Sequence, residues 1–159
     1  MERPSRFLQS LLVLHMIIEV IFACDCKPIT LEEAMCKSHT VILARVSFEE
    51  LLDQEGFVTF KESEAKGTRY KIQVQQVFKD QGTNKLSLEN NYGCLAFPRH
   101  SSDCGGVLLE GKDYIIAGYV DWKGELYSST CYHIVQYEDI VNDRHKTNIL
   151  QGDADCANA

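Results

Sequence analysis

The stretch Cys24-Asp25-Cys26-Lys27-Pro28 sets two cysteines one residue apart. Cysteines at this spacing cannot easily bridge each other, so each is expected to reach a different distant cysteine. The start of the cysteine-bearing region would then be pinned to two separate parts of the fold. Pro28 biases Lys27 toward extended backbone, which predicts an extended edge. The pinning either serves only to stabilise the fold or presents this edge rigidly to a binding partner.

Residues 1–23 have the order of a secretory signal peptide. Arg3 and Arg6 precede an apolar stretch that ends at Phe22, and Ala23 stands directly before the first cysteine. Polar residues interrupt the apolar stretch, which is too short for a membrane span of about 20 apolar residues. We therefore expect cleavage after Ala23, secretion to the extracellular space and no membrane span. The expected mature domain covers residues 24–156, followed by a tail at 157–159.

The cysteines indicate an oxidising compartment. All seven follow the expected cleavage point, and secreted domains of this size commonly supplement their cores with disulfides. Seven is an odd number, so one cysteine is free or bonded to another chain. The net charge of −7 makes the chain a poor ligand for nucleic acid, and no nucleic-acid partner is expected.

Two segments carry helix signals. Thr30 as N-cap and Glu33 three residues later form a capping box, which predicts a short helix to about Cys36. From Glu138 the chain has acidic residues early and cations later, as helix dipoles favour. This pattern predicts a second helix that ends near Gly152.

Strand signals fill the region between these helices. A continuous apolar run or a two-residue alternation marks each expected strand, and a turn at Asp121–Gly124 joins the last two. The expected strands are 41–46, 70–75, 85–88, 113–120 and 125 to about 132. The long acidic connection 47–68 is interpreted as a projecting hairpin or a mobile loop. Together these patterns predict an all-β fold with small helices: a five-stranded closed β-barrel with two short flanking helices, stapled by disulfides.

The sequence contains little that suggests catalysis. H-E-x-x-H, G-x-S-x-G and P-loop motifs do not occur, and without C-x-x-C pairs a zinc knuckle or thioredoxin-type site is disfavoured. The four histidines after the leader are isolated and are interpreted as surface or strand residues: His39, His100, His133 and His145. Acidic clusters such as Glu49-Glu50 are either solvated or face a basic partner. We expect neither an enzyme nor a cofactor of its own; a secreted enzyme is the least favoured alternative.

The order of motifs resembles the N-terminal netrin-like domain of the tissue inhibitors of metalloproteinases. The resemblance extends over essentially all of the chain after the leader, and we expect a single-domain form. The matching features are Cys24-x-Cys26-x-Pro28, the spacing to Cys36, Val41-Ile42-Leu43-Ala44-Arg45, Cys104-Gly105, Tyr114-Ile115-Ile116-Ala117-Gly118, Ser129-Thr130-Cys131 and the spacing to Cys156.

The resemblance implies an OB-type barrel, a set of disulfides and a site. The implied pairs are Cys24–Cys104, Cys26–Cys131 and Cys36–Cys156, which leave Cys94 unpaired. The implied protease-binding residues are Cys24, Asp25, Cys26, Lys27, Pro28, Ser102, Asp103 and Cys104. In this mechanism the free α-amino group and carbonyl oxygen of Cys24 chelate the catalytic zinc of a target metalloproteinase, so the zinc belongs to the partner.

Two departures from the family pattern bear on the target. In the family, the residue between the first two cysteines enters the protease's main specificity pocket and is usually Thr or Ser. In this sequence that residue is Asp25. A carboxylate in an apolar pocket loses hydration worth several kcal/mol unless a cation meets it. The family's His-Pro-Gln segment is replaced by Thr30-Leu31-Glu32. We therefore hypothesise that Asp25 narrows the target range to proteases with a basic or hydrated pocket.

Two further questions stay open at the level of sequence. The alternative function is a netrin-like module that binds a matrix component, a receptor or a signalling protein without using zinc, and it is motivated by Asp25 and the acidic connection. Cys94 is a buried free thiol, a link to a second chain that makes an oligomer, or a local competitor for Cys104.

Overall fold

The computed structural model describes residues 26–27, 29–56, 58–59, 61, 65–100 and 104–157. The expected signal peptide at 1–23 lies outside the described residues, as does the end of the expected tail. The elements in chain order are α2 (Leu31–Lys37), β1 (Thr40–Leu52), β2 (Gly67–Asp80), β3 (Tyr92–Pro98), β4 (Asp113–Val120), β5 (Leu126–Tyr127), β6 (Ile134–Gln136), α3 (Glu138–Val141), α4 (Arg144–Asn148) and the π-helical turn η3 (Ile149–Asp153). None of the helices in the described part is long and apolar enough to cross a membrane.

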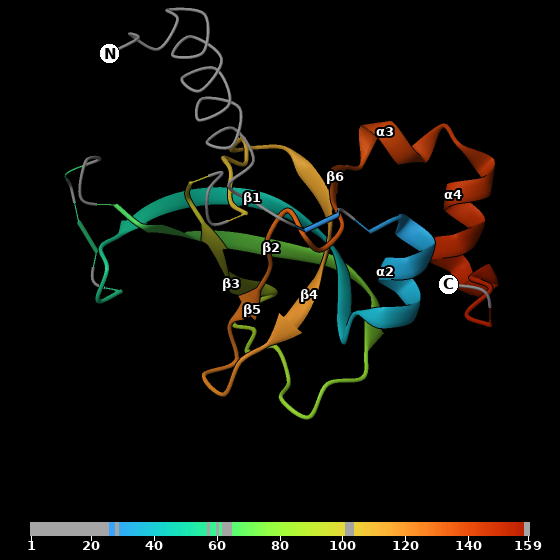
Figure 1. Cartoon of the computed structure of the whole chain (residues 1–159), viewed down its shortest axis with the longest axis horizontal. Coiled ribbons are helices and arrows are strands. Elements are labelled where there is room, and N and C mark those ends of the chain that lie inside the picture. The colour runs from blue at the N-terminus through green and yellow to red at the C-terminus, as the bar shows by residue number, and fades with distance from the viewer. Residues whose placement is uncertain are drawn as a thin grey trace, which may run out of the picture.

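Five strands form a closed ring of hydrogen-bonded neighbours (Figure 1). The ring runs β1–β2–β3–β5–β4 and returns from β4 to β1, with β3 and β5 parallel and the other pairs antiparallel. The short strand β6 adds to β4 beside β5. This arrangement confirms the predicted all-β fold with a ring of five strands and small helices.

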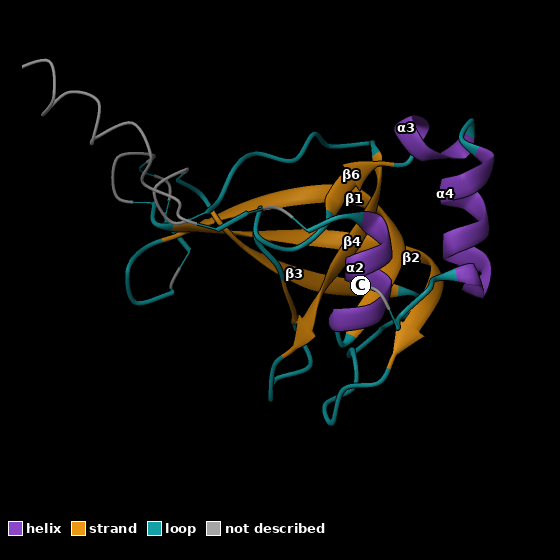
Figure 2. Cartoon of the chain, turned by 45° about the vertical axis from the view of Figure 1, so that its right-hand side comes forward, coloured by secondary structure: helices purple, strands orange, loops and turns teal. Residues whose placement is uncertain are grey.

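The apolar patterns of the strands explain how the ring is filled. Tyr70, Ile72 and Val74 of β2 alternate into the interior, where they meet Leu95 and Phe97 of β3. β1 and β4 are apolar on both faces because their outward residues form a second core with the helices. This second core contains Leu31, Ala34, Val41, Leu43, Ile115, Ala117, Ile140, Ile149 and Leu150. The helices accordingly gather on one side of the molecule (Figure 2).

Local signals were right for α2 and wrong for the C-terminal helix. Thr30 and Glu33 form the predicted capping box at the start of α2. The predicted helix from Glu138 to Gly152 is instead divided into α3, α4 and η3. Asp143 adopts extended backbone and caps the N–H groups of the following turn, and Gly152 has a left-handed φ of 112°. Asp143 favours a new N-cap over a continuous helix.

Two strand predictions also need correction. Residues 85–88 form no strand, and β3 begins after them at Tyr92. Asn90 and Asn91 take positive φ values of 53° and 67°, which amide residues tolerate better than most, so they make a turn just before β3. The predicted strand at 125–132 is limited to β5, because residues 128–132 leave the ladder before β6.

The connection at 47–68 is largely a hairpin, as one of the two interpretations proposed. β1 continues to Leu52 and β2 begins at Gly67, with paired residues from Phe48–Lys71 to Leu52–Gly67. Only the first half of β1 also pairs with β4. The second half of β1 pairs with β2 alone and, with the described part of the connection to β2, extends to the left in Figure 1; we call this segment, residues 48–66 as far as the structure describes them, the arm.

Candidate functional site

Disulfides hold the first described residues against distant parts of the chain. Cys26 is bonded to Cys131, with 5.4 Å between the Cα atoms and 105 residues between them in sequence. Cys36 is bonded to Cys156 and holds α2 to the C-terminal segment. Both pairs are those that the family resemblance implies. Cys104 is also disulfide-bonded, while its expected partner Cys24 lies outside the described residues.

The Cys26 and Cys104 disulfides touch. The Cys26 and Cys104 sulfurs are 3.6 Å apart, and the sulfurs of Cys26, Cys104 and Cys131 lie within 4.8 Å of one another. All three are disulfide sulfurs, which differ from the thiolates that bind zinc. The cluster is therefore a pair of neighbouring disulfides that places Cys26 directly beside Cys104. Cys26, Lys27 and Cys104 are the described residues of the predicted binding edge, called the edge from here on.

The loop that carries Cys104 is held by backbone contacts. Gly105 lies so close to the carbonyl of Pro98 that a Cβ would overlap it. Gly106 N–H donates to the same carbonyl at 3.0 Å. The carbonyl of Cys104 accepts two bonds from Thr130, at 2.7 Å from its N–H and 2.9 Å from its hydroxyl. These contacts clamp the loop after β3 to the segment that leads into Cys131.

A histidine holds the chain on the other side of Cys26. His133 Nδ1 lies 3.1 Å from the carbonyl oxygen of Ile29, and since a carbonyl only accepts, Nδ1 carries the proton. Nε2 is buried and has no hydrogen-bond partner in the described part of the chain. Burial lowers the pKa of His133, with a smaller contribution from Lys146. His133 is therefore a half-buried residue, directly before β6, that fixes the segment before α2.

An apolar groove of about 790 Å³ borders this edge. Its lining includes Ile29, Thr130 and His133, and also Val107 and Leu109, which are 61% and 53% exposed. Leu109 N–H donates to the hydroxyl of Tyr114 at 3.0 Å. The edge therefore has an adjoining surface where apolar contacts are available to a partner.

The arm is anchored close to the same edge. Arg99 Nη1 donates to Glu49 Oε1 at 2.7 Å, and the Arg99 side chain is only 14% exposed. His100 Nε2 lies 2.9 Å from the carbonyl oxygen of Ala65. The base of the arm is thus tied to the end of β3, a few residues before Cys104.

The structure places only part of the predicted site. Cys26 and Cys104 are half-buried and in contact, and Lys27 is exposed. Cys24, Asp25, Pro28, Ser102 and Asp103 lie outside the described residues. No role at this edge was predicted for Gly105, Thr130 or His133. Gly105 and Thr130 stand in the Cys104-Gly105 and Ser129-Thr130-Cys131 motifs, but their contacts depend on strand pairing.

Cys94 lies apart from the sulfur cluster. It is the free cysteine of the described residues and sits within β3, opposite Lys71 of β2. Burial raises the pKa of its thiol, and the nearby Glu125 carboxylate adds to this shift. A raised pKa disfavours the reactive thiolate.

The family model described as tissue inhibitor of metalloproteinase matches residues 22–157. The chain belongs to this family. It is an inhibitor family, which agrees with the prediction that the chain is not an enzyme.

Relatives within the family differ in length. The chain is 28% identical over 148 residues to "Putative metalloproteinase inhibitor tag-225" of Caenorhabditis elegans, covering 89% of this chain and 85% of the relative. It is 27% identical over 147 residues to metalloproteinase inhibitor 2 of Homo sapiens, covering 91% of this chain but 63% of the relative. The rat protein of the same name is 28% identical, again with 63% of its length covered. The match to the mammalian inhibitors thus spans less than two thirds of their length.

Proposed function

We propose that the chain is a secreted inhibitor of zinc metalloproteinases that acts through its processed N-terminus. Family membership gives the class of target. The observation that carries the proposal is the fastening of Cys26, which is bonded to Cys131 and in contact with Cys104. A segment held in this way loses little conformational entropy when it docks.

The proposed chemistry uses the residue that cleavage after Ala23 would expose. The α-amino nitrogen and the carbonyl oxygen of Cys24 chelate the target's catalytic zinc from its open side and displace the bound water. The amine must be neutral to donate its lone pair. Its reference pKa is about 7.7, and metal binding promotes proton loss, so the reaction is feasible at neutral pH.

The remaining edge residues would form the contact ridge. Lys27 and Pro28 continue the extended segment, and Ser102 and Asp103 precede Cys104 in the adjoining loop. Asp25 enters the specificity pocket and restricts the targets to proteases that offer a cation or retained water there. Replacing Asp25 with Thr should broaden inhibition across ordinary matrix metalloproteinases. An unchanged inhibition profile would count against this role.

The decisive experiment changes only the N-terminal amine. Mass spectrometry of the secreted protein first establishes whether the mature chain begins at Cys24. One Ala is then added before Cys24, with a matched control that carries one extra Ala after Ala159. We expect the first variant to lose inhibition about a thousandfold and the control to lose none. Equal melting temperatures verify the fold, and tight inhibition by the blocked variant would falsify zinc chelation.

A second candidate function is supported by the arm. The arm is acidic, projects from the ring and is anchored through Arg99 and Glu49. A netrin-like module could use it to bind a basic surface on a matrix component, receptor or signalling protein. In that case Glu55→Lys should weaken partner binding, whereas the added N-terminal Ala should not. The two variants separate this function from inhibition.

A further inference from the structure

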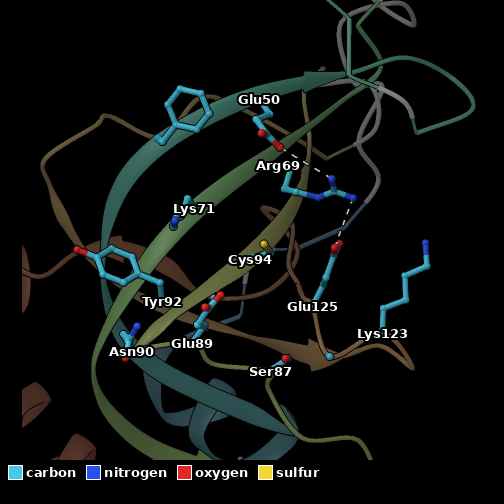
Figure 3. Close-up of a pocket in the computed structure, with 13 residues that line it drawn as sticks. Glu50, Arg69, Lys71, Ser87, Glu89, Asn90, Tyr92, Cys94, Lys123 and Glu125 are labelled. Atoms are coloured by element: carbon cyan, nitrogen blue, oxygen red, sulfur yellow. Dashed lines mark ion pairs between the residues drawn. The ribbon is translucent and has the colours of Figure 1, made fainter.

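A second concave site lies on the outer face of the ring, formed by other residues than the proposed edge. It is a cavity of about 570 Å³ over β2 and β3, bordered by the base of the arm and by the turn between β4 and β5 (Figure 3). Its main side chains are Phe48, Glu50, Arg69, Tyr92, Lys123 and Glu125.

Glycines and strand register make this surface hollow. Phe48, Lys71 and Cys94 are paired neighbours on β1, β2 and β3, so they form a row across the cavity. Gly124 has a φ of 83°, and a Cβ there would lie 2.7 Å from Ser87 Cβ. Ser87 N–H donates to the Gly124 carbonyl at 2.9 Å. The segment around Ser87 and the β4–β5 turn thereby form one continuous wall.

Arg69 lies at the centre of the polar groups. Its guanidinium is 3.9 Å from Glu50 and 3.4 Å from Glu125. Figure 3 marks both ion pairs with dashed lines. These separations are longer than direct hydrogen bonds. Arg69 Nε is buried and unpartnered within the described residues. Arg69 therefore lies between two carboxylates, and its Nη groups form ion pairs with them at distances longer than direct hydrogen bonds, so these donors and acceptors can still bond to a ligand.

The charges of the cavity balance. Arg69, Lys71 and Lys123 contribute three cations, and Glu50, Glu89 and Glu125 contribute three carboxylates. A polyanion would be repelled by the carboxylates, and a polycation would be repelled by the basic groups. The balance favours a neutral ligand that both donates and accepts hydrogen bonds.

Aromatic groups supply the apolar part of the site. Phe48 is 52% exposed although it lies on a strand, and Tyr92 has the Lys71 ammonium 5.1 Å from its ring centroid. Trp122, in the adjacent turn, is 82% exposed. Such rings offer flat apolar faces beside hydrogen-bonding groups. The C–H faces and hydroxyl edges of a pyranose match this combination.

The position in the fold limits the ligand class further. In OB-folds the face of the second and third strands, with the loops between strands one and two and between strands four and five, binds oligonucleotides or oligosaccharides. The cavity shares the face of β2 and β3 and the β4–β5 turn with this position, while Phe48 and Glu50 of β1, and not the loop between β1 and β2, also line it. The net charge of −7 and the three carboxylates disfavour the polyanionic oligonucleotide. We infer that this cavity is a binding site for a neutral oligosaccharide, a function separate from inhibition.

Cys94 provides a direct readout of occupancy. Its sulfur lines the cavity at the centre of Figure 3, and it is the free thiol of the described chain. A bound oligosaccharide would cover it and slow its reaction with a maleimide. The secreted protein is therefore titrated with a panel of neutral oligosaccharides of glucose, mannose or N-acetylglucosamine, and both heat of binding and alkylation rate are measured.

Matched variants locate the binding. Phe48→Ala should weaken binding about three- to tenfold through loss of stacking. Arg69→Lys keeps the charge but removes the planar fork, and should weaken it about tenfold. The controls are Val77→Ala, another exposed apolar residue of the sheet, and Arg45→Lys, whose arginine pairs with Asp113 outside the cavity. Both controls should bind like the unaltered protein.

Three results would overturn the inference. One is that no sugar of the panel gives heat or protects Cys94. Another is that binding survives equally in Phe48→Ala and Arg69→Lys. The third is binding confined to sulfated chains and abolished by salt, which would identify a polyanion site instead. Because the added N-terminal Ala should leave sugar binding intact, failure of the inhibitor proposal is distinguishable from failure of this one.

Discussion

The two ends of β3 build two different kinds of surface. After Pro98 the chain enters the edge, where disulfides and backbone contacts hold Cys104 and Cys26 together. Around Tyr92 and Cys94 the chain lines the outer cavity, whose proposed ligand-binding groups are side chains. The edge should therefore keep its conformation when single side chains are replaced and lose it when its disulfides or backbone contacts are broken. The cavity should lose binding through single side-chain changes that leave the fold intact.

Removal of the Cys26–Cys131 disulfide should have the largest effect. The bond closes a loop spanning 105 residues in sequence, and loss of a native disulfide from a small secreted domain costs about 2 to 5 kcal/mol. The double variant Cys26→Ser with Cys131→Ser should lose this stability and the inhibitory edge, as measured by chemical unfolding and inhibition assays. Cys94→Ser is the control and should cost less than about 1 kcal/mol. Equal losses of stability in both variants would contradict the claim that the edge depends on this disulfide.

Gly105→Ala should have the second largest effect on stability and inhibition. A Cβ at Gly105 would overlap the Pro98 carbonyl, so the backbone of the edge must move. We expect a loss of about 3 kcal/mol in the free energy of unfolding, together with weaker inhibition. Gly106 is the matched control, because its Cβ would meet Phe97 Cε1 at an ordinary 3.7 Å. Thermal unfolding of the two variants provides the measurement. An unchanged stability of Gly105→Ala would show that the backbone around Gly105 can move at little cost.

Arg99→Met tests the tie between arm and edge. The Arg99–Glu49 pair is 2.7 Å long and mostly sheltered, so its loss leaves a partly buried carboxylate unpaired. We expect a cost of about 1 to 2 kcal/mol and faster hydrogen exchange in the arm. Lys112→Met removes the more exposed pair with Glu138 and should cost less than about 1 kcal/mol. Similar exchange rates in both variants would argue that the arm does not depend on Arg99.

The smallest expected effect is the pH dependence from His133. Burial lowers the pKa of this histidine in the folded protein, whereas in the unfolded chain it is about 6.5. As pH falls below the unfolded value, the unfolded chain gains a proton that the folded chain takes up only at lower pH. Stability from His133 is therefore full above the unfolded pKa and is lost as pH falls through the folded pKa.

His133→Gln isolates this contribution. The glutamine amide can still donate to the Ile29 carbonyl but does not titrate. Melting temperatures measured from pH 7 to pH 5 should fall less for the variant than for the unaltered protein. Parallel curves would assign the acid sensitivity to other groups.

Local chemistry in the sequence was sufficient for several elements. The capping box specifies α2 because both of its hydrogen bonds form within four consecutive residues. β4 has its predicted bounds because its apolar run contains strand-forming residues throughout. The odd cysteine count required one cysteine without an intrachain partner. Each of these features depends on neighbours in sequence or on simple counting.

The tertiary structure decided what depends on distant partners. β3 and the ring closure arise from pairing between segments far apart in sequence, as does the limit of β5. The roles of Thr130 and His133 follow from contacts with Cys104 and Ile29, which lie 26 and 104 residues away. The outer cavity likewise requires three strands and a turn to meet. Residue types set which contacts are possible, but only the packed chain determines which of them form, because each depends on the position of both partners.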